Sequence, residues 1–224
     1  MISPEVLYRI APWSRELDES ARARACRGIS EKVFSKGATV CHRGDRFDSW
    51  AGVCEGIVSL ETVSRAGKAV CLAGVRDGGW FGEGSMLKGE PRRYDIVPLR
   101  DTRLALMDRA TFFWMFEHSA GFNRYLVRQF NERLAQFMAQ VEYDRMLDAP
   151  ARVARTIAWL FNPTLYPECG KHLAITQEDV GLLSGVSRQS ANQSLRLLED
   201  ERLISADRNG ITIIDLAKLQ RFGD

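Results

Sequence analysis

Two helix-start signals separated by a glycine constrain the fold of residues 175–200 more than any other feature of this chain. Thr176 precedes a short helical pattern and has Asp179 three residues later, which makes a loose capping box. Gly185 suits the left-handed conformation that ends many helices, and Ser187 is a good N-cap for the next helix. We therefore expect two short helices joined by a glycine-containing turn, which is a helix-turn-helix.

The second of these predicted helices, VSRQSANQSLRLLED (186–200), has one polar and one apolar side. At helical spacing Ala191, Leu195 and Leu198 fall on the side that would face a core. The other side carries five polar residues: Arg188, Gln189, Asn192, Gln193 and Arg196. Such a face is most often only solvated, but arginine, asparagine and glutamine also make bidentate contacts to guanine and adenine edges.

A two-stranded wing is predicted directly after this helix. Two β-like runs bracket Asp207-Arg208-Asn209-Gly210, and Asn-Gly is a strong hairpin signal. With a wing beside it, the polar face is expected to meet DNA and to read bases through Arg188, Gln189, Asn192 and Gln193. The side chains expected to hold DNA phosphates are Thr176, Ser187, Ser190 and Arg196.

The charge balance of the chain does not by itself indicate a nucleic-acid partner. The formal net charge is +2 over 224 residues, and residues 150–224 hold as many acidic as basic side chains. The expectation of DNA binding therefore rests on the pattern. An apolar fraction of 45%, no run of eighteen apolar residues and no signal-peptide pattern predict a soluble cytoplasmic protein without a membrane span.

Metal sites, disulfides and enzyme motifs are not predicted. The five cysteines are far apart and form no C-x-x-C pair: Cys26, Cys41, Cys54, Cys71 and Cys169. The three histidines are equally scattered. The sequence also has no P-loop, no dinucleotide glycine fingerprint and no Ser/His/Asp order, so we expect no catalytic site and no bound metal.

The first half of the chain predicts an antiparallel β structure behind short helices. From about Ile29 to Met107, β-like runs alternate with glycine, which favours an antiparallel barrel or sandwich with tight turns such as RAGKA at 65–69. Residues 4–26 indicate short helices, with Ser14 and Asp18 as candidate caps.

A long helix is predicted between about Thr111 and Asp148. Large apolar residues recur there at steps of three and four: Phe122, Leu126, Phe130, Leu134, Phe137 and Val141. This stripe must be buried either on the barrel or on a second copy of the chain. A symmetric helix pair is the favoured alternative, so these six residues are the predicted dimer interface. Asp148 and Pro150 then begin a new helix, which marks a hinge and gives predicted domains of 1–110, 111–148 and 149–224.

Taken in this order, the features resemble the Crp/Fnr family of bacterial transcription regulators along essentially the whole chain. The resemblance is carried by DGGWFGEG (77–84), LDAPARVART (147–156) and ITQEDVGLLSGVSRQSANQSLRLLEDERLIS (175–205). It implies an α+β fold: an N-terminal antiparallel β-roll of the jelly-roll type, a dimerisation helix and a C-terminal winged helix-turn-helix. It also implies a nucleoid-associated homodimer that binds a palindromic DNA site and contacts RNA polymerase.

The family's effector pocket maps only partly onto this sequence. In the cyclic-AMP sensors of the family, Gly-Glu is followed about ten residues later by Arg and then Ser or Thr, which hold the ribose and the phosphate. Gly82, Glu83 and Arg93 match, but Tyr94 and Asp95 follow Arg93. Phe137 and Met138 stand where those sensors recognise adenine with a Thr-Ser pair. The candidate pocket implied by the resemblance is Gly82, Glu83, Gly84, Arg93, Tyr94, Phe137 and Met138, and its departures argue against cyclic AMP.

Three effector hypotheses stay open: another cyclic nucleotide, a cyclic dinucleotide, or no ligand, with Glu83 and Arg93 left as a surface pair. No iron–sulfur cluster is expected, because Cys26 alone cannot supply four thiolates, and no residue argues for a haem. In the recognition helix, Gln189 and Gln193 replace a Glu and an Arg of the best-known members, which predicts a different half-site. The alternative function is a signalling adaptor whose winged helix contacts protein.

Overall fold

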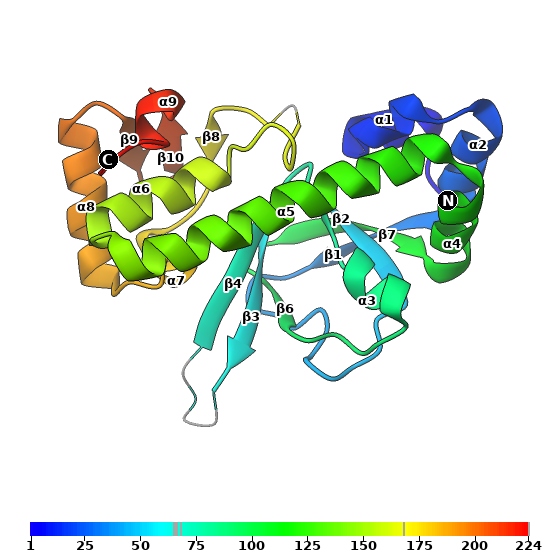
Figure 1. Cartoon of the computed structure of the whole chain (residues 1–224), viewed down its shortest axis with the longest axis horizontal. Helices are drawn as coiled ribbons and strands as arrows, with labels where there is room; N and C mark the ends of the chain where they lie inside the picture. The colour runs from blue at the N-terminus through cyan, green and yellow to red at the C-terminus, as the bar shows by residue number, and fades with distance from the viewer. Residues whose placement is uncertain (65–66, 68, 168, 224) are drawn as a thin grey trace.

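The computed structural model describes residues 1–64, 67, 69–167 and 169–223. Figure 1 shows a β-roll with helices at one end, a long helix α5 that runs across the molecule, and a compact C-terminal unit at the far end of that helix. The predicted α+β class is confirmed. The turn predicted at 65–69 falls mostly outside the described residues.

Short helices cover one end of the roll, as predicted. They are α1 (Pro4–Ile10), the 3-10 helix η1 (Pro12–Glu16) and α2 (Glu19–Gly28). Asp18 caps α2, because its carboxylate accepts a hydrogen bond from the Ala21 backbone N–H over 2.8 Å. The prediction of Ser14 as a cap is wrong: Ser14 lies inside η1 and is fully buried, and the cap of α1 is Ser3.

The β-roll consists of antiparallel strands, which confirms that prediction. The strands are β1 (Ile29–Phe34), β2 (Ser49–Glu55), β3 (Ile57–Val63), β4 (Ala69–Arg76), β5 (Trp80–Phe81), β6 (Asp95–Pro98) and β7 (Thr102–Asp108). One sheet has the order β1-β7-β2-β5 and the other the order β4-β3-β6. The short helix α3 (Glu83–Lys88) follows β5, and its N-cap residue Gly82 has a φ of 96° that favours glycine.

An aromatic cluster ties the terminal helices to the roll. Trp50 and Trp80 lie with ring centroids 4.3 Å apart, and Trp13 lies 5.4 Å from Phe122 of α5. The indole N–H of Trp80 donates to the Ile10 carbonyl over 3.1 Å. These contacts fix the first turns of α5 on the β-roll.

The region predicted as one long helix, 111–148, is two helices in the structure. They are α4 (Arg109–His118) and α5 (Ala120–Met146), and Ser119 between them is extended and caps α5. The break brings α5 close to η1: a Cβ on Gly121 would lie 2.5 Å from the Glu16 carbonyl oxygen. The direction of α5 is therefore set by a close backbone approach that its own pattern does not reveal.

The C-terminal unit is a winged helix-turn-helix, as predicted. It contains α6 (Ala149–Trp159), β8 (His172–Leu173), α7 (Gln177–Ser184), α8 (Arg188–Asp200), β9 (Ile204–Asp207), β10 (Gly210–Ile213) and α9 (Leu216–Leu219). Asp148 caps α6 by accepting from the Ala151 N–H over 3.0 Å, so a new helix does begin at the predicted hinge. No helix in the described part of the chain is both long and apolar enough to cross a membrane.

Candidate DNA-binding face and effector cavity

Local signals build the turn between α7 and α8. Thr176 and Asp179 form a full capping box at the start of α7, with the Asp179 N–H donating to the Thr176 hydroxyl over 3.2 Å. Gly185 ends α7 with a φ of 64°, and the Ser187 hydroxyl accepts from the Ser190 N–H over 3.1 Å. The predicted helix-turn-helix is therefore present with its predicted caps.

Helix α8 is two-sided, as the sequence predicted. Ala191, Leu195 and Leu198 are at most 2% exposed and lie in the core of the C-terminal unit. Arg188, Gln189, Gln193 and Arg196 are exposed, and Asn192 is half-buried. The Asn192 amide donates to the Gln177 side-chain oxygen over 2.7 Å, so the first helix holds a predicted base-reading residue of the second.

A groove of about 530 Å³ runs between α8 and the wing. Among the predicted DNA contacts, Thr176, Arg188, Asn192 and Arg196 line it. Gln189 and Gln193 are exposed outside this lining, and the Ser187 and Ser190 hydroxyls bond to each other over 2.9 Å.

The sequence did not predict several polar residues of the groove, among them Gln177, Arg208 and Lys36. Three carboxylates, Glu178, Glu199 and Asp207, line it as well. Arg208 lies in the predicted wing turn, which was a usable signal. Lys36 belongs to the β-roll and follows β1, so no local pattern could have placed it beside α8.

The wing is held in shape by its turn residues. The Asp207 carboxylate accepts from the backbone N–H groups of Asn209 and Gly210 over 2.7 and 3.1 Å. A Cβ on Gly210 would lie 2.1 Å from the Leu173 carbonyl oxygen, so only glycine fits between β10 and β8. The predicted Asn-Gly hairpin thus presents Arg208 at its tip.

The candidate effector residues gather around a cavity of about 370 Å³ between α3, β4 and α5. All of the predicted pocket residues except Met138 line it: Gly82, Glu83, Gly84, Arg93, Tyr94 and Phe137. Met138 does not line the cavity of the single chain and is 66% exposed there, so its place in the pocket stays a prediction. The helical turn after Phe137 carries the Met138 side chain away from the roll.

Two arginines next to each other in sequence have opposite roles. Arg93, the predicted phosphate ligand, is 75% exposed at the side chain and is paired with Glu90 over 2.8 Å. Arg92 is 1% exposed, and its Nη1 and Nη2 donate to the carbonyl oxygens of Gly82 and Ser49, each over 2.7 Å. Glu83, the predicted ribose ligand, accepts from the Trp50 indole N–H over 3.3 Å.

The cavity has a cationic group that the sequence reasoning did not name. Arg133 of α5 lines it, and its buried Nη2 has no hydrogen-bond partner among the described residues. Its Nη1 donates to the Gln136 side chain over 2.9 Å and to the Tyr166 hydroxyl over 3.2 Å. Apolar walls from Phe130, Leu134 and Phe137 face this guanidinium, so the cavity suits a ligand with an apolar body and an anionic group. Burial raises the pKa of Tyr94, which therefore stays a neutral phenol beside it.

Within the ranges that the structure describes, no three His, Cys, Asp or Glu side chains come together as metal ligands. Burial raises the pKa of the Cys54 and Cys71 thiols to about 12, so both stay protonated near neutral pH.

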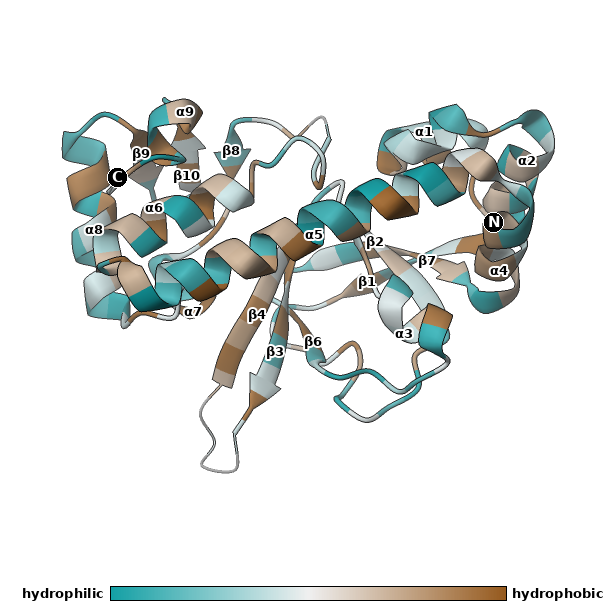
Figure 2. Cartoon of the chain, in the orientation of Figure 1, coloured by the Kyte–Doolittle hydropathy of each residue, from teal (hydrophilic) through white to brown (hydrophobic). Residues whose placement is uncertain are grey.

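The stripe predicted as the dimer interface divides into two parts. Phe122 and Leu126 are 0% and 2% exposed and pack with the tryptophans of their own chain, so their assignment to a dimer contact is wrong. The remaining residues, Phe130, Leu134, Phe137 and Val141, are 39 to 59% exposed. Figure 2 shows hydrophobic stretches along α5 between hydrophilic ones.

Comparisons with known proteins match both parts of the molecule. The family model for a cyclic nucleotide-binding domain matches residues 31–119, and that for a Crp-like helix-turn-helix domain matches residues 151–222. The cAMP-activated global transcriptional regulator CRP of Pasteurella multocida is 27% identical over 79% of this chain and 85% of its own length. The cAMP-activated global transcriptional regulator Vfr of Pseudomonas aeruginosa is 22% identical over 76% of this chain and 83% of its own.

Solved structures share the fold over nearly the whole chain. FixK2 from Bradyrhizobium japonicum has a TM-score of 0.72 at 16% identity, covering 88% of this chain and 98% of its own. A putative cAMP-binding regulatory protein from Silicibacter pomeroyi has a TM-score of 0.67 at 18% identity, covering 98% and 99%. With both domain models matched in the family's order, this chain belongs to the Crp/Fnr family of transcription regulators.

Proposed function

We propose that this protein acts as a homodimer that reads a two-fold DNA site with α8 and the adjoining wing. The observation that carries the proposal is the groove in which Arg188, Asn192 and Arg196 of α8 lie beside Arg208 of the wing. Arg188 is the expected reader of guanine, and Asn192 and the two exposed glutamines suit adenine. The hydroxyls at the helix starts and Arg196 are the expected phosphate contacts.

The exposed part of the α5 stripe supports the dimer. Val127, Phe130, Leu134, Phe137 and Val141 follow one another at steps of three and four, and all are exposed by at least 39%. An apolar seam with this spacing is stabilised by a second, equivalent helix. In such a dimer we expect the two recognition helices about 34–36 Å apart, one turn of the duplex.

The proposed domains are 1–110 for the sensor, 111–148 for the dimerisation helices and hinge, and 149–224 for the DNA-binding unit. The place of action is the cytoplasm at the nucleoid, where such a regulator would meet RNA polymerase. The signalling-adaptor alternative has less support, because the C-terminal match is to a Crp-like helix-turn-helix.

The effector site is the cavity between α3 and α5. Its ligand would carry an anionic group held by Arg133, because among the described residues that line the cavity this arginine has a buried nitrogen, Nη2, without a hydrogen-bond partner. Cyclic AMP fits less well, since Arg93 is paired with Glu90 and Glu83 is held by Trp50. Other cyclic nucleotides and cyclic dinucleotides remain the candidates, with a ligand-free regulator as the alternative.

The test is capture of sheared bacterial genomic DNA by the purified protein, compared with a variant in which Arg188, Gln189 and Gln193 are all alanine. A matched variant, Arg221→Ala, also removes one positive charge, at an exposed position outside the groove. We expect discrete fragments with the wild type and the matched variant, and none with the recognition-face variant. Retention of the same fragments by the recognition-face variant would favour the adaptor.

A further inference from the structure

Tyr166 belongs to the C-terminal half of the chain but is buried in the β-roll. It follows α6, is 0% exposed, and lies with Leu165 in the apolar core formed by the strands of the roll. A Cβ on Gly79 would lie 2.6 Å from the Tyr166 ring, so the glycine after the β4 turn makes room for it. The loop that leads to the helix-turn-helix is therefore anchored inside the other half of the molecule.

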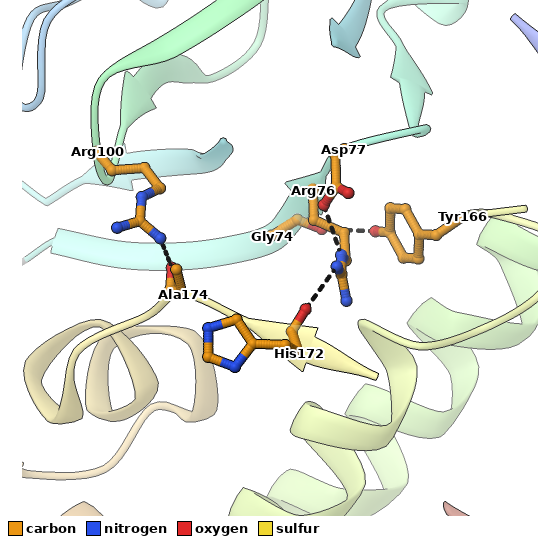
Figure 3. A network of polar contacts seen from close by, with 7 residues as sticks. All are labelled: Gly74, Arg76, Asp77, Arg100, Tyr166, His172 and Ala174. Carbon is orange, nitrogen blue, oxygen red and sulfur yellow. Dashed lines mark hydrogen bonds and ion pairs between the residues drawn. The ribbon is translucent and has the colours of Figure 1, made fainter. Parts of the chain in front are cut away.

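The hydroxyl of Tyr166 joins three parts of the fold. It donates to the Gly74 carbonyl oxygen of β4 over 2.8 Å, as Figure 3 shows. It accepts from Nη1 of Arg133 on α5 over 3.2 Å, and the Arg133 guanidinium lies 5.6 Å from the centre of the Tyr166 ring. Since Arg133 also lines the effector cavity, this hydroxyl is one hydrogen bond away from that site.

Further contacts seat the winged helix on the same strands. Arg76 at the end of β4 donates from Nη2 to the His172 carbonyl oxygen over 3.0 Å and pairs with Asp77 over 2.8 Å. Arg100 donates to the Ala174 carbonyl oxygen (Figure 3). At Gly74 the side chains of Leu160 and Leu183 come so close that a Cβ would lie 3.1 and 2.9 Å from them.

In this packing of the winged helix on the β-roll, the DNA-binding face stays exposed, and the β-roll contributes a residue to it. Arg188 and Arg196 are exposed, and Lys36 of the β-roll lines the same groove. In this docked arrangement a cation from the first half of the chain therefore lies beside α8. The docked arrangement is therefore the one that offers DNA a surface built from both halves.

We propose that Tyr166 is a positioning residue that holds the winged helix in its DNA-binding arrangement without any ligand. Its hydroxyl fastens the loop before β8 to β4 and α5, and Arg133 connects this anchor to the effector cavity. An anion bound at Nη2 of Arg133 would act directly on the guanidinium whose Nη1 donates to the Tyr166 hydroxyl. The inference goes beyond the proposed function and rests on it only where DNA affinity is the readout.

The test compares Tyr166→Phe, which keeps the ring and removes the hydroxyl, with Tyr125→Phe. Tyr125 is also buried, and its hydroxyl accepts from Gln129 in the aromatic cluster, away from the winged helix. Both full-length variants are studied without ligand by hydrogen exchange of peptides covering 69–76, 162–167 and 177–184, and by affinity for a duplex selected with the wild type. A second variant, Arg133→Gln, breaks the same anchor from α5.

We expect Tyr166→Phe to exchange faster than the wild type in all three peptides and to bind the duplex about tenfold more weakly, because both hydrogen bonds of the hydroxyl are lost. Arg133→Gln should change both readouts in the same direction, and Tyr125→Phe should change neither. Unchanged exchange in 162–167 would overturn the proposal, as would equal or tighter DNA binding by Tyr166→Phe. If the wild type selects no sequence, the proposed function fails while hydrogen exchange still tests the anchor.

Discussion

Arg92 donates from Nη1 to the carbonyl oxygen of Gly82, the N-cap residue of α3, over 2.7 Å. Its other terminal nitrogen donates to Ser49, and its guanidinium lies 5.2 Å from the centre of the Phe47 ring. In the family's cyclic-AMP sensors an arginine near this position meets the ligand phosphate. Here the buried arginine is bonded to its own backbone, and its neighbour Arg93 is turned to solvent.

This relationship makes opposite predictions for the two arginines. Arg92→Met should lower the free energy of unfolding by about 3 kcal/mol, because two buried carbonyl groups lose a charged donor. Arg93→Met should change it by less than about 0.5 kcal/mol, as expected for an exposed side chain. Urea unfolding of both variants checks this, and equal losses would show that the two side chains are not differently placed.

The same geometry predicts that cyclic AMP does not stabilise the protein. A ligand that binds only the folded state raises the free energy of unfolding by about 2.7 kcal/mol when its concentration is one hundred times its dissociation constant. With Arg93 and Glu83 both engaged elsewhere, we expect no rise in the melting temperature on adding millimolar cyclic AMP. The measurement is thermal unfolding with and without the nucleotide, and a reproducible rise of several degrees would reinstate cyclic AMP as the effector.

The contact between Gln177 and Asn192 predicts that Gln177 positions Asn192 for DNA binding without touching a base itself. Gln177→Ala removes the acceptor that holds the Asn192 amide over 2.7 Å. We expect it to weaken specific DNA binding by about 0.5–1.5 kcal/mol, in the range of one net hydrogen bond, and less than Asn192→Ala does. Fluorescence anisotropy with a selected duplex measures both. A larger loss for Gln177→Ala would mean that Gln177 itself contacts DNA.

The α5 seam predicts where a charge abolishes the dimer. Leu134 is 59% exposed in the single chain, and Leu134→Glu places a carboxylate inside the predicted helix pair. Ala135, which is also exposed, lies about 100° further around the helix, so Ala135→Glu is the matched control. We expect sedimentation to show monomers for Leu134→Glu at micromolar concentration and dimers for the control. Dimers in both would place the interface elsewhere.

Short sequence signals predicted the helix caps well. The predictions that failed depend on tertiary packing, which such signals do not record. Asp18, Asp148, Thr176 and Ser187 cap helices as expected, because a cap depends on its own few residues. Ser14 failed because η1 is buried against the roll, which no local pattern records.

The long apolar stripe of α5 shows most clearly what the sequence pattern could not predict. Phe122 and Phe130 occupy equivalent places in one repeating pattern, yet the first is 0% exposed and the second 39%. Which part meets the chain's own tryptophans depends on where the helix lies on the roll. Arg133 and Tyr166 were missed for the same reason, since their contact spans 33 residues and leaves no periodic signal.

If Arg188 reads a base, its removal should lower both the affinity for DNA and the sequence specificity. Arg188→Ala should weaken binding to the preferred duplex by about 1–3 kcal/mol and relax selection at one base pair in each half-site. Arg221→Ala, at an exposed position outside the groove, is the charge-matched control. Competition assays with duplexes varied at single positions separate the two effects. An equal loss on random DNA would show that Arg188 holds only phosphate.

The most direct test of the account is selection of bound sequences from random duplexes by the purified wild-type protein, without ligand and at a stated salt concentration. We predict a two-fold motif with half-site centres about 10 base pairs apart, guanine at the position that depends on Arg188, and half-sites unlike those of the cyclic-AMP regulators. Only salt-sensitive binding without a motif, both alone and with cyclic mononucleotides and dinucleotides added, would contradict the central claim.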